Sequence, residues 1–344
     1  MELDRIRKVA VLGGGVMGHG IAQVAAFSGF STVIRDISRE ILEKAMQNLE
    51  RNLNRMVERN RITAEMAKET LNRISTSVDL AEAVRDADLI IEAIPEDLGI
   101  KKRVWSEVSS IAGSDVICVT NTSSISITAI SEAIANPQRF AGMHFFNPPA
   151  VMRLVEIIPG RETSFDTIKT VEDLARKMGK TPVIVKKDSP GFIVNRILIT
   201  YINEAAKLLE EGLWSKEQID ASIQYKAKMP MGPFTLSDLI GLDIIHSILK
   251  VFEEGFGPYY KPAPLIERLV AEGKLGRKTG EGFYTYKETP TVSEAASEGF
   301  DTNLLLRIFR EEAEKLVAEE VADQASIDTA MKLGANLPYG PFEL

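Results

Sequence analysis

Residues 8–36 read KVAVLGGGVMGHGIAQVAAFSGFSTVIRD, and this stretch decides the fold. The apolar run Lys8 to Leu12 predicts a buried strand, and a cluster of glycines follows it directly. Small and apolar residues then favour a helix toward Phe27, before the β-branched run Thr32 to Arg35 predicts a second strand. A strand, a helix and a second strand in this order are typical of a parallel βαβ unit.

The glycines of this turn predict a dinucleotide site. They stand as Gly13-x-Gly15-x-x-Gly18, with Val16 and Met17 opening the helix inside the same segment. Glycine allows a tight turn, close approach of a pyrophosphate to the backbone and packing of helix on strand, while the helix N-terminus favours the phosphate charge. We therefore expect residues 13–18 to bind the cofactor.

An acidic residue at the end of the second predicted strand favours NAD as that cofactor. Asp36 follows Gly18 by 18 positions, near the spacing of the acid that binds the ribose hydroxyls of NAD. Its charge would repel the 2′-phosphate of NADP. Arg35 beside it leaves NADP open, because an arginine can accommodate that phosphate; the alternative for Arg35 is an outward-facing strand residue.

Further β-branched runs alternate with helical patterns as far as residue 187, which predicts a Rossmann-like, doubly wound α/β domain over residues 1–187. Residues 38–73 interrupt this plan, because they are longer and more charged than a bare crossover helix needs. They predict an inserted pair of helices, with a solvated hairpin as the alternative. The expected strands are Val9–Leu12, Thr32–Arg35, Leu89–Glu92, Val116–Thr120, Phe140–His144, Leu154–Ile158 and Pro182–Val185.

Past Ser189-Pro190-Gly191 the pattern becomes helical, so we expect an all-α C-terminal domain over residues 188–290. Its beginning is repeated at the end of the chain. A shift of 108 positions aligns residues 189–236 with 297–344 without gaps, and 18 of the 48 pairs are identical. Residues 291–344 are therefore expected to form a partial second copy of the helical domain.

Composition limits the classes of function. The chain has 344 residues, a net charge of −8 and one cysteine, Cys118. It shows no concentrated basic face for nucleic acid, no apolar run long enough to span a membrane, and no cysteine set for a disulfide framework or a thiolate zinc site. We expect a cytoplasmic globular protein without a metal site.

One of the three histidines has a partner at a suggestive spacing. His144 ends a predicted strand, and Glu156 lies twelve positions later in the apolar run Leu154-Val155-Glu156-Ile157-Ile158. If the two strands fold back about Ala150, the imidazole faces the carboxylate, which is the arrangement that a general base needs. A core histidine beside an unrelated glutamate is the alternative. His19 and His246 are expected to be structural or surface residues.

Two further segments place polar side chains where a loop meets a regular element. They are Asn121-Thr122-Ser123-Ser124 and Pro190-Gly191-Phe192-x-x-Asn195-Arg196. Each alone is typical of a cap or turn. With the glycine motif, His144-Phe-Phe-Asn147-Pro and Glu156, they occur in the order and spacing of the 3-hydroxyacyl-CoA dehydrogenases. The chain resembles this family over about residues 5–287, including Pro230-Met-Gly-Pro-Phe234 and Gly276-Arg-Lys278, and is most similar to its short-chain 3-hydroxybutyryl-CoA type.

The resemblance implies NAD-dependent, reversible oxidation of an (S)-3-hydroxyacyl-CoA to the 3-oxoacyl-CoA, as in fatty-acid β-oxidation. It implies that His144 takes the proton of the C3 hydroxyl, that Glu156 orients His144, and that Ser123 and Asn195 bind the C3 oxygen. By the same resemblance, residues around the cofactor are Glu96, Lys101, Asn121, Ser123, Asn147 and Lys278. Coenzyme A contacts would come from Ser123 and, on the inserted helices, from Asn52 and Arg59, both of which depart from the family's usual residues.

The resemblance also concerns assembly. Single-copy members pair through their helical domains, so a homodimer or another homo-oligomer is expected, and a second copy in the same chain can take the partner's place. We expect the tail to dock on the first copy with pseudo-twofold symmetry, through a stripe of Leu306, Phe309, Leu316 and Val317. The tail is similar to the beginning of the second copy in fused dehydrogenase/hydratase enzymes, which leaves a longer bifunctional protein open.

Two other readings remain. A sibling dehydrogenase acting on a sugar acid such as gulonate has a similar fold and catalytic pair; Phe145-Phe146 and the basic inserted helix favour the acyl-CoA substrate instead. A crystallin-like, non-catalytic protein is the second, and the presence of all four residues Ser123, His144, Glu156 and Asn195 argues against it. Acyl chain length depends on cavity shape and is left open.

Overall fold

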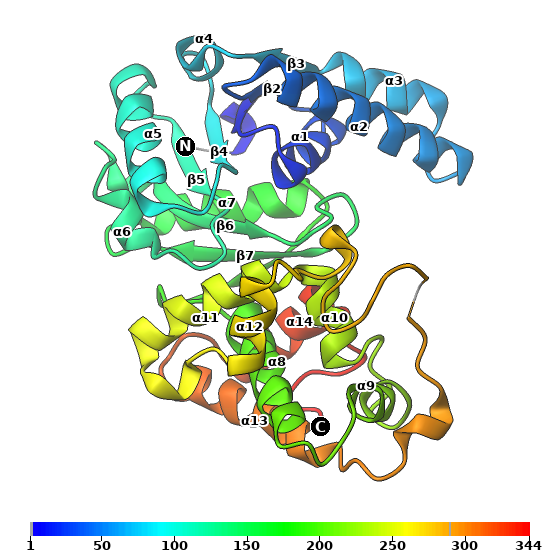
Figure 1. Cartoon of the computed structure of the whole chain (residues 1–344). Helices are drawn as coiled ribbons and strands as arrows, with labels where there is room; N and C mark the ends of the chain where they lie inside the picture. The colour runs from blue at the N-terminus through cyan, green and yellow to red at the C-terminus, as the bar shows by residue number, and fades with distance from the viewer. Residues whose placement is uncertain (1–2, 289) are drawn as a thin grey trace. The chain divides into compact units, whose positions relative to one another are not determined.

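The structure is a computed structural model that describes residues 3–288 and 290–344. These residues form two compact units, one ending at Asp188 and one beginning at Ser189 (Figure 1). The expected fold class is confirmed: a Rossmann-like, largely parallel sheet with flanking helices is followed by an all-helical part.

The described part of the first unit contains a sheet of eight strands in the order β3-β2-β1-β4-β5-β6-β7-β8. All neighbouring strands are parallel except β6 and β7. The strands are β1 Lys8–Leu12, β2 Ser31–Arg35, β3 Ile74–Ser77, β4 Leu89–Glu92, β5 Ile117–Thr120, β6 Phe140–Phe145, β7 Leu154–Pro159 and β8 Thr181–Ile184.

Among the strands of the described residues, β3 is the one that the sequence pattern missed. Its residues Ile-Ser-Thr-Ser carry a single large apolar side chain, and β3 pairs only with β2 at the edge of the sheet. An edge strand packs little of its surface, so it needs no run of apolar residues and leaves no clear pattern in the sequence.

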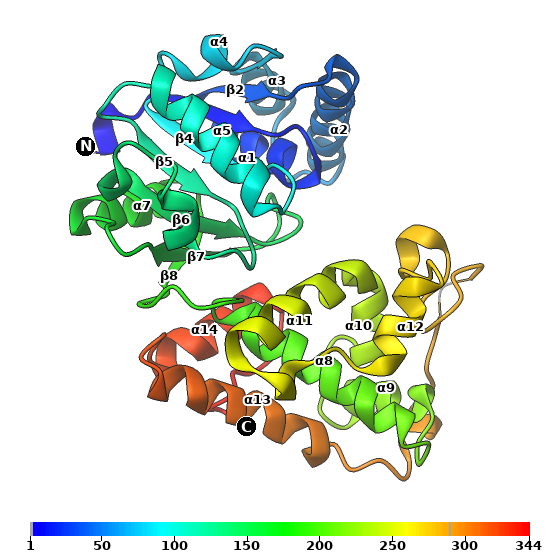
Figure 2. The same cartoon turned by 60° about the vertical axis from the view of Figure 1, so that its left-hand side comes forward.

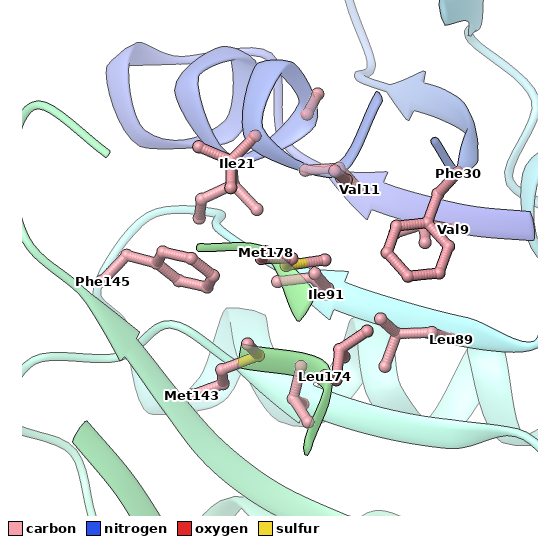
Figure 3. Packing of buried hydrophobic residues seen from close by; sticks show 14 of the residues in the cluster. Val9, Val11, Ile21, Phe30, Leu89, Ile91, Met143, Phe145, Leu174 and Met178 are labelled. Carbon is pink, nitrogen blue, oxygen red and sulfur yellow. The ribbon is translucent and has the colours of Figure 1, made fainter. Parts of the chain in front are cut away.

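Helices cover both faces of this sheet. They are α1 Val16–Phe27, α2 Arg39–Glu58, α3 Ala64–Asn72, α4 Leu80–Val84, α5 Leu98–Ile111, α6 Ile127–Ser131 and α7 Phe165–Lys177. On one face, side chains of α1, α2 and α7 join alternate residues of the strands in a single core that includes Val9, Ile21, Ile91, Met143 and Leu174 (Figure 3). On the other face, α5 lies across the sheet (Figure 2). Its Trp105 is buried against the ring of Phe140.

The insertion between β2 and β3 is a helical pair, as expected. The pair consists of α2 and α3, which lie side by side in Figure 1. Ser38 and Thr63 cap their N-termini by accepting hydrogen bonds from the backbone amides of Ile41 and Met66. Leu53 of α2 packs with Ile62 and Ala67 in a small core of its own, which makes the pair a semi-independent arm.

The second unit is built around one buried helix. Helix α8 contacts α10, α11, α12, α13 and α14. The helices of this unit are α8 Val194–Glu210, α9 Lys216–Tyr225, α10 Pro233–Ile240, α11 Leu242–Phe256, α12 Pro264–Ala271, α13 Asn303–Ala318 and α14 Gln324–Gly334. Helix α13 runs alongside α8 in both views (Figures 1 and 2).

The shift of 108 positions found in the sequence also relates these helices, since it brings α8 onto α13 and α9 onto α14. The same shift also relates two aspartates, Asp220 and Asp328, that hold the turn after the second helix of each copy. The Asp220 carboxylate accepts a hydrogen bond from the amide of Phe234 at 2.9 Å, and Asp328 accepts one from Phe342 at the same distance. In both copies, the carboxylate of an aspartate thus holds the Gly-Pro-Phe turn through a hydrogen bond from the Phe amide.

Helix α13 packs on α8 with a stripe that differs from the expected one. Phe309 and Leu316 are buried as expected, but Leu306 and Val317 are only half-buried, and Leu305 and Ile308 are buried in their place. The helix is therefore rotated from the orientation assumed for the stripe, and Glu312 also points inward, where it forms an ion pair with the buried Arg196.

Candidate active site

The site residues of the first unit gather at the carboxyl ends of the parallel strands, where open α/β sheets bind their ligands. The turn at Gly13 follows β1, Asp36 follows β2, Glu96 lies beyond β4, Asn121 follows β5 and His144 lies near the end of β6. The topology thus brings together residues that are far apart in the sequence.

The glycine turn has the geometry of a ligand cradle. Gly13 has φ +105°, and a Cβ added to it would lie 2.4 Å from the carbonyl oxygen of Ala93. A Cβ on Gly18 would lie 1.8 Å from the carbonyl oxygen of Gly13, so neither position admits a side chain. At Gly15 the same test meets no described atom within 4 Å. The turn is therefore tightly built on its inner side and open at Gly15.

The N-terminus of α1 next to this opening can receive an anion. Among the described residues no side chain caps α1, so its first backbone amides keep their hydrogen-bonding capacity. Val16 is exposed there and Met17 is half-buried. His19 is buried one turn further on, with its Nδ1 2.8 Å from the carbonyl oxygen of Gly15, which fits the structural role expected for it.

Asp36 is held at the edge of this cradle. Its Oδ2 accepts a hydrogen bond from the amide of Gly14 at 2.8 Å, and its Oδ1 accepts one from the amide of Ser38 at 3.3 Å. These bonds tie the carboxylate to the glycine turn and to the start of α2. The residues present thus fit a dinucleotide, with backbone amides for the pyrophosphate and a fixed carboxylate for a ribose.

His144 and Glu156 face each other as the sequence predicted. They are directly paired residues of the antiparallel strands β6 and β7, and His144 Nδ1 lies 2.7 Å from Glu156 Oε2. Glu156 is 0% exposed and His144 is also buried. Because an isolated buried carboxylate is costly, the pair is a specific arrangement in which the carboxylate fixes the ring and can stabilise its protonated form.

Glu96 holds the loop after β5. Its Oε1 accepts hydrogen bonds from the hydroxyl of Thr122 at 2.6 Å and from the amides of Ser123 at 2.9 Å and Ser124 at 3.1 Å. The hydroxyl of Ser123 lies 3.3 Å from the same oxygen. Burial raises the pKa of the Glu96 carboxyl, but the charge of Lys101 and these hydrogen bonds outweigh it, so this pKa lies below its usual range.

Lys101 lies behind Glu96 and is 1% exposed. Its ammonium group is 3.3 Å from Glu96 Oε2 and 2.5 Å from Glu92 Oε1. Glu92, at the end of β4, also accepts hydrogen bonds from Thr120 at 2.7 Å and from the indole of Trp105 at 3.4 Å. The three charges form a chain that runs from the buried Glu92 and Lys101 to Glu96, whose side chain is 37% exposed. This chain connects the core of the sheet to residues 121–124, the serine loop.

The segments on either side of His144 are fixed by other side chains. The Asn121 side-chain oxygen accepts a hydrogen bond from the amide of Phe145 at 2.8 Å, which joins the serine loop to β6. Beyond β6, Asn147 is exposed, and Lys180 donates to the carbonyl oxygens of Pro149 and, at 2.8 Å, of Met152. Burial lowers the pKa of Lys180 to about 8.

Asn52 and Arg59, the residues of the helical pair expected to contact coenzyme A, lie seven positions apart on α2 and its C-terminal cap, and hence on the same side of that helix. Arg59 is exposed at the C-terminal cap. Asn52 is half-buried, and its amide donates to the side-chain oxygen of Gln23 on α1 at 3.5 Å. Arg59 thus offers a charge to solvent, whereas Asn52 is engaged with the neighbouring helix.

Two of the expected site residues, Asn195 and Lys278, belong to the second unit. Asn195 lies in the first turn of α8. Lys278 forms an ion pair with Asp243 at 2.5 Å. The loop that carries Lys278 is held by Asp238, whose carboxylate accepts hydrogen bonds from the amides of Phe283 and Tyr284, both at 2.8 Å.

Glu92, Asp220 and Asp238 are supporting residues that the sequence reasoning missed. Each is a buried carboxylate with several donors, and each holds a segment that the sequence reasoning did single out. Their one signal in the sequence is an acidic residue inside an apolar stretch, as in Leu89-Ile-Ile-Glu92. That signal also marks many surface positions, so it does not identify them without the fold.

Other kinds of site find no support in residues 3–288 and 290–344. No cluster of His, Cys, Asp or Glu there has the arrangement of a metal site. No helix in these ranges is long and apolar enough to cross a membrane. Cys118 is buried in β5, and burial raises the pKa of its thiol to about 12.

Comparison with known proteins assigns both parts of the chain to one family. Residues 8–189 match the NAD binding domain of 3-hydroxyacyl-CoA dehydrogenase. Residues 191–286 and 299–344 match the C-terminal domain of the same enzyme. The second segment includes α13 and α14, the helices that the shift of 108 positions relates to α8 and α9.

Individual relatives agree. The chain is 43% identical to human mitochondrial hydroxyacyl-coenzyme A dehydrogenase over 289 residues, which cover 82% of this chain and 92% of the relative. It is 42% identical to the 3-hydroxybutyryl-CoA dehydrogenase of Clostridioides difficile, covering 82% of this chain and all of the relative. The crystal structure of 3-hydroxybutyryl-CoA dehydrogenase from Escherichia coli superposes with a TM-score of 0.91 at 31% identity, over 98% of this chain and 90% of the other. The chain therefore belongs to the 3-hydroxyacyl-CoA dehydrogenase family, oxidoreductases that act on a CH–OH group with NAD.

Proposed function

We propose that this enzyme catalyses the reversible oxidation of a short-chain (S)-3-hydroxyacyl-CoA, of the 3-hydroxybutyryl-CoA class, to the corresponding 3-oxoacyl-CoA. The observation that carries the proposal is the buried pair of His144 and Glu156 at the carboxyl end of the sheet, 2.7 Å apart. The names of the similar proteins from Clostridioides difficile and Escherichia coli support the short acyl chain.

His144 acts as the general base in the oxidation. With Nδ1 protonated and donating to Glu156, the other ring nitrogen, Nε2, has a lone pair with which to take the proton of the C3 hydroxyl. Glu156 keeps the ring in this tautomer and offsets the charge of the imidazolium that forms. In the reverse direction the imidazolium returns the proton to the C3 oxygen.

Ser123 and Asn195 bind the C3 oxygen and stabilise the charge that develops on it. For Ser123 the support is the rigid setting of its backbone, which Glu96 holds through the amides of Ser123 and Ser124. A group positioned in advance loses little free energy in reorganising during the reaction, which is why such a setting suits an oxygen-binding residue.

NAD is held by Gly13, Gly15, Val16, Met17, Gly18 and Asp36, with Glu96, Asn121, Ser123, Asn147 and Lys278 around its other end. When bound, it supplies the acceptor for the hydride that leaves C3. We assign Lys101 an indirect part, because its ammonium group is buried against Glu92 and Glu96. Coenzyme A contacts come from Ser123 and, on α2, from Asn52 and Arg59.

Location and assembly are part of the proposal. The single, buried Cys118 suits a reducing compartment and supports a cytoplasmic location. Exposed apolar side chains of the second unit, such as Leu213, Leu239 and Ile244, support self-association into a homo-oligomer. Sedimentation of the purified enzyme over a range of concentrations tests the second point.

The test of the activity is a spectrophotometric assay that follows loss of NADH with acetoacetyl-CoA as substrate. His144→Gln is expected to lower kcat by a factor of about 10² to 10⁴, the usual effect of losing a general acid or base. The affinity for NADH, measured by fluorescence titration, should change little. His246→Gln, in the second unit, is the matched control and should retain full activity. Near-normal turnover of His144→Gln would remove this residue from the mechanism.

A further inference from the structure

A buried cation lies at the start of α8. The guanidinium of Arg196 is 1% exposed, and it stacks on the ring of Phe256 with 3.6 Å between its central carbon and the ring centre. It also donates a hydrogen bond to the hydroxyl of Tyr260 at 3.2 Å. Neither neighbour carries a negative charge, so within the first copy of the helical domain these two contacts leave the charge of Arg196 unbalanced.

The charges that balance Arg196 come from the tail, the partial second copy in residues 291–344. Glu312 of α13 is 1% exposed, and its Oε2 accepts a hydrogen bond from Arg196 Nε at 3.0 Å. Glu319 accepts a second bond from Arg196 at 3.2 Å. Lys315 lies 2.5 Å from Glu312 and completes a cluster of two positive and two negative side chains. The cluster spans more than a hundred positions of sequence.

Arg196 is placed where it can control the neighbouring Asn195. The first turn of α8 is held in part by the amide of Arg196, which donates to the carbonyl oxygen of Gly191 at 3.1 Å, and in part by the buried Arg196 side chain. Adjacent residues of a helix point about 100° apart, so anchoring Arg196 sets the direction of Asn195.

We infer that Glu312 is a positioning residue for the reaction: by neutralising Arg196 it fixes the first turn of α8 and with it the side chain of Asn195. The inference rests on the proposed function, in which Asn195 binds the C3 oxygen. It assigns the partial second copy a part in catalysis, because the helix that carries Asn195 is held by a carboxylate that only the tail supplies among the described residues.

The test is a double-mutant cycle in the full-length enzyme, with kcat for acetoacetyl-CoA and KM for NADH as readouts. Asn195→Ala removes one oxygen-binding group and is expected to lower kcat about 10²-fold. Glu312→Gln is expected to lower kcat about tenfold or more, since small displacements of a positioned group have effects of this size, with KM for NADH unchanged. In the Asn195→Ala background, Glu312→Gln should have almost no further effect on kcat.

A matched control lies on the same helix. Glu314 is exposed and pairs with Arg310 at 2.7 Å, so Glu314→Gln removes a carboxylate of α13 without touching Arg196 and should leave kcat unchanged. If Glu312→Gln lowers kcat by the same factor with and without Asn195, its effect is a general loss of structure and the inference is wrong.

A second variant tests the inference in case Glu312→Gln does not fold. Arg196→Met with Glu312→Met removes both charges and replaces them with apolar side chains of similar size, a change that often preserves stability. This double variant is expected to melt near the temperature of the unmodified enzyme but to have reduced kcat; full kcat would overturn the inference. If Asn195→Ala alone leaves kcat unchanged, the proposed role of Asn195 fails and the inference falls with it. If Asn195→Ala lowers kcat and Glu312→Gln does not, only the inference fails.

Discussion

Three glutamates of the first unit, of which Glu92 and Glu156 are buried, differ in what they hold. Glu156 orients an imidazole, Glu96 collects the amides and hydroxyls of the serine loop, and Glu92 is the counter-ion of a buried lysine. A buried carboxylate is stable only when donors or a cation meet its charge. Removing a partner of Glu92 or Glu156 therefore leaves a buried charge unbalanced, so these two residues are sensitive to substitution even where they do not touch a ligand.

At the residue scale, Asp36 should set the preference for NADH over NADPH. Asp36→Ala removes the carboxylate expected on the ribose hydroxyls and should weaken NADH binding about tenfold or more relative to NADPH, the effect of losing a hydrogen bond to a charged group. Because Asp36 also holds the amides of Gly14 and Ser38, both cofactors should lose some affinity. The ratio of the two dissociation constants, from fluorescence titration, isolates the first effect.

Arg35→Ala is the companion variant for this measurement. If Asp36→Ala leaves the ratio of dissociation constants unchanged while Arg35→Ala alters it, the arginine determines the preference and the role given to Asp36 is wrong.

A second residue-scale prediction concerns pH. Burial raises the pKa of Asp220 to about 6, although the hydrogen bonds from Thr235 and Phe234 act in the opposite direction. The folded state then binds more protons than the unfolded state between about pH 4 and pH 6, so this group makes the free energy of unfolding fall as pH rises through that window. The full contribution is about 3 kcal/mol, from a shift of roughly two pKa units.

Asp220→Asn removes the titration. Urea unfolding of both proteins at several pH values should show a smaller fall in the free energy of unfolding between about pH 4 and pH 6 for the variant. The variant should be less stable above this window as well, because an amide has one acceptor oxygen where the carboxylate uses two. Parallel pH profiles for the two proteins would show that Asp220 does not titrate in this range.

At the element scale, α2 combines two tasks. Its buried residues Leu42 and Leu49 join the core of the sheet, and beyond them the helix continues into the arm that it forms with α3. The arm presents the exposed Arg59 at its C-terminal cap. Because α2 is anchored to the sheet at its N-terminal half, its exposed C-terminal end can place the charge of Arg59 at a distance from the sheet, where a long substrate could reach it.

Arg59→Ala is expected to raise KM for acetoacetyl-CoA severalfold and to make that KM less dependent on salt, because an exposed charge partner of the nucleotide is lost. A substrate without the adenosine 3′-phosphate should be less affected. Arg51→Ala, which removes an exposed arginine eight positions earlier on the same helix and about 80° around its axis, is the matched control. Equal effects of Arg59→Ala on both substrates would leave α2 without a role in binding the nucleotide.

At the scale of the whole molecule, the chain consists of two compact units with separate tasks. The first contains the NAD binding domain, with the His144–Glu156 pair, and the second contains both helical copies. Two residues that the shift of 108 positions makes equivalent, Tyr201 and Phe309, contact each other, with ring centres 4.5 Å apart. Contact between equivalent residues is what a pseudo-twofold relation produces near its axis.

Phe309→Ala tests this packing. Phe309 is buried, so its truncation should cost about 3–5 kcal/mol of the stability of the second unit. Leu306→Ala, a half-buried position of the same helix, should cost much less. Hydrogen exchange resolved by segment should show the loss in α8 and α13, while NADH affinity stays unchanged. If Leu306→Ala loses as much stability as Phe309→Ala, Leu306 belongs to the buried stripe, as the sequence predicted, and the packing described for α13 is wrong.

Local patterns in the sequence determined much of this protein. The strand, glycine turn and helix at residues 8–27, the inserted pair at residues 38–73 and the facing of His144 and Glu156 all depend on short-range spacing. Glycine at a turn and alternation along a strand are set by backbone sterics, which act within a few residues. For the same reason the repeat was visible before its packing was known.

Only the tertiary structure decided which polar groups are buried together. The edge strand β3, the chain from Glu92 through Lys101 to Glu96, and the pair of Arg196 with Glu312 depend on contacts between distant segments. An acidic residue looks the same in the sequence whether it is solvated or meets a buried cation. Its role depends on desolvation, which the packing of the whole unit determines, and for that reason the rotation of α13 and the position of Glu312 could not be predicted from helical spacing alone.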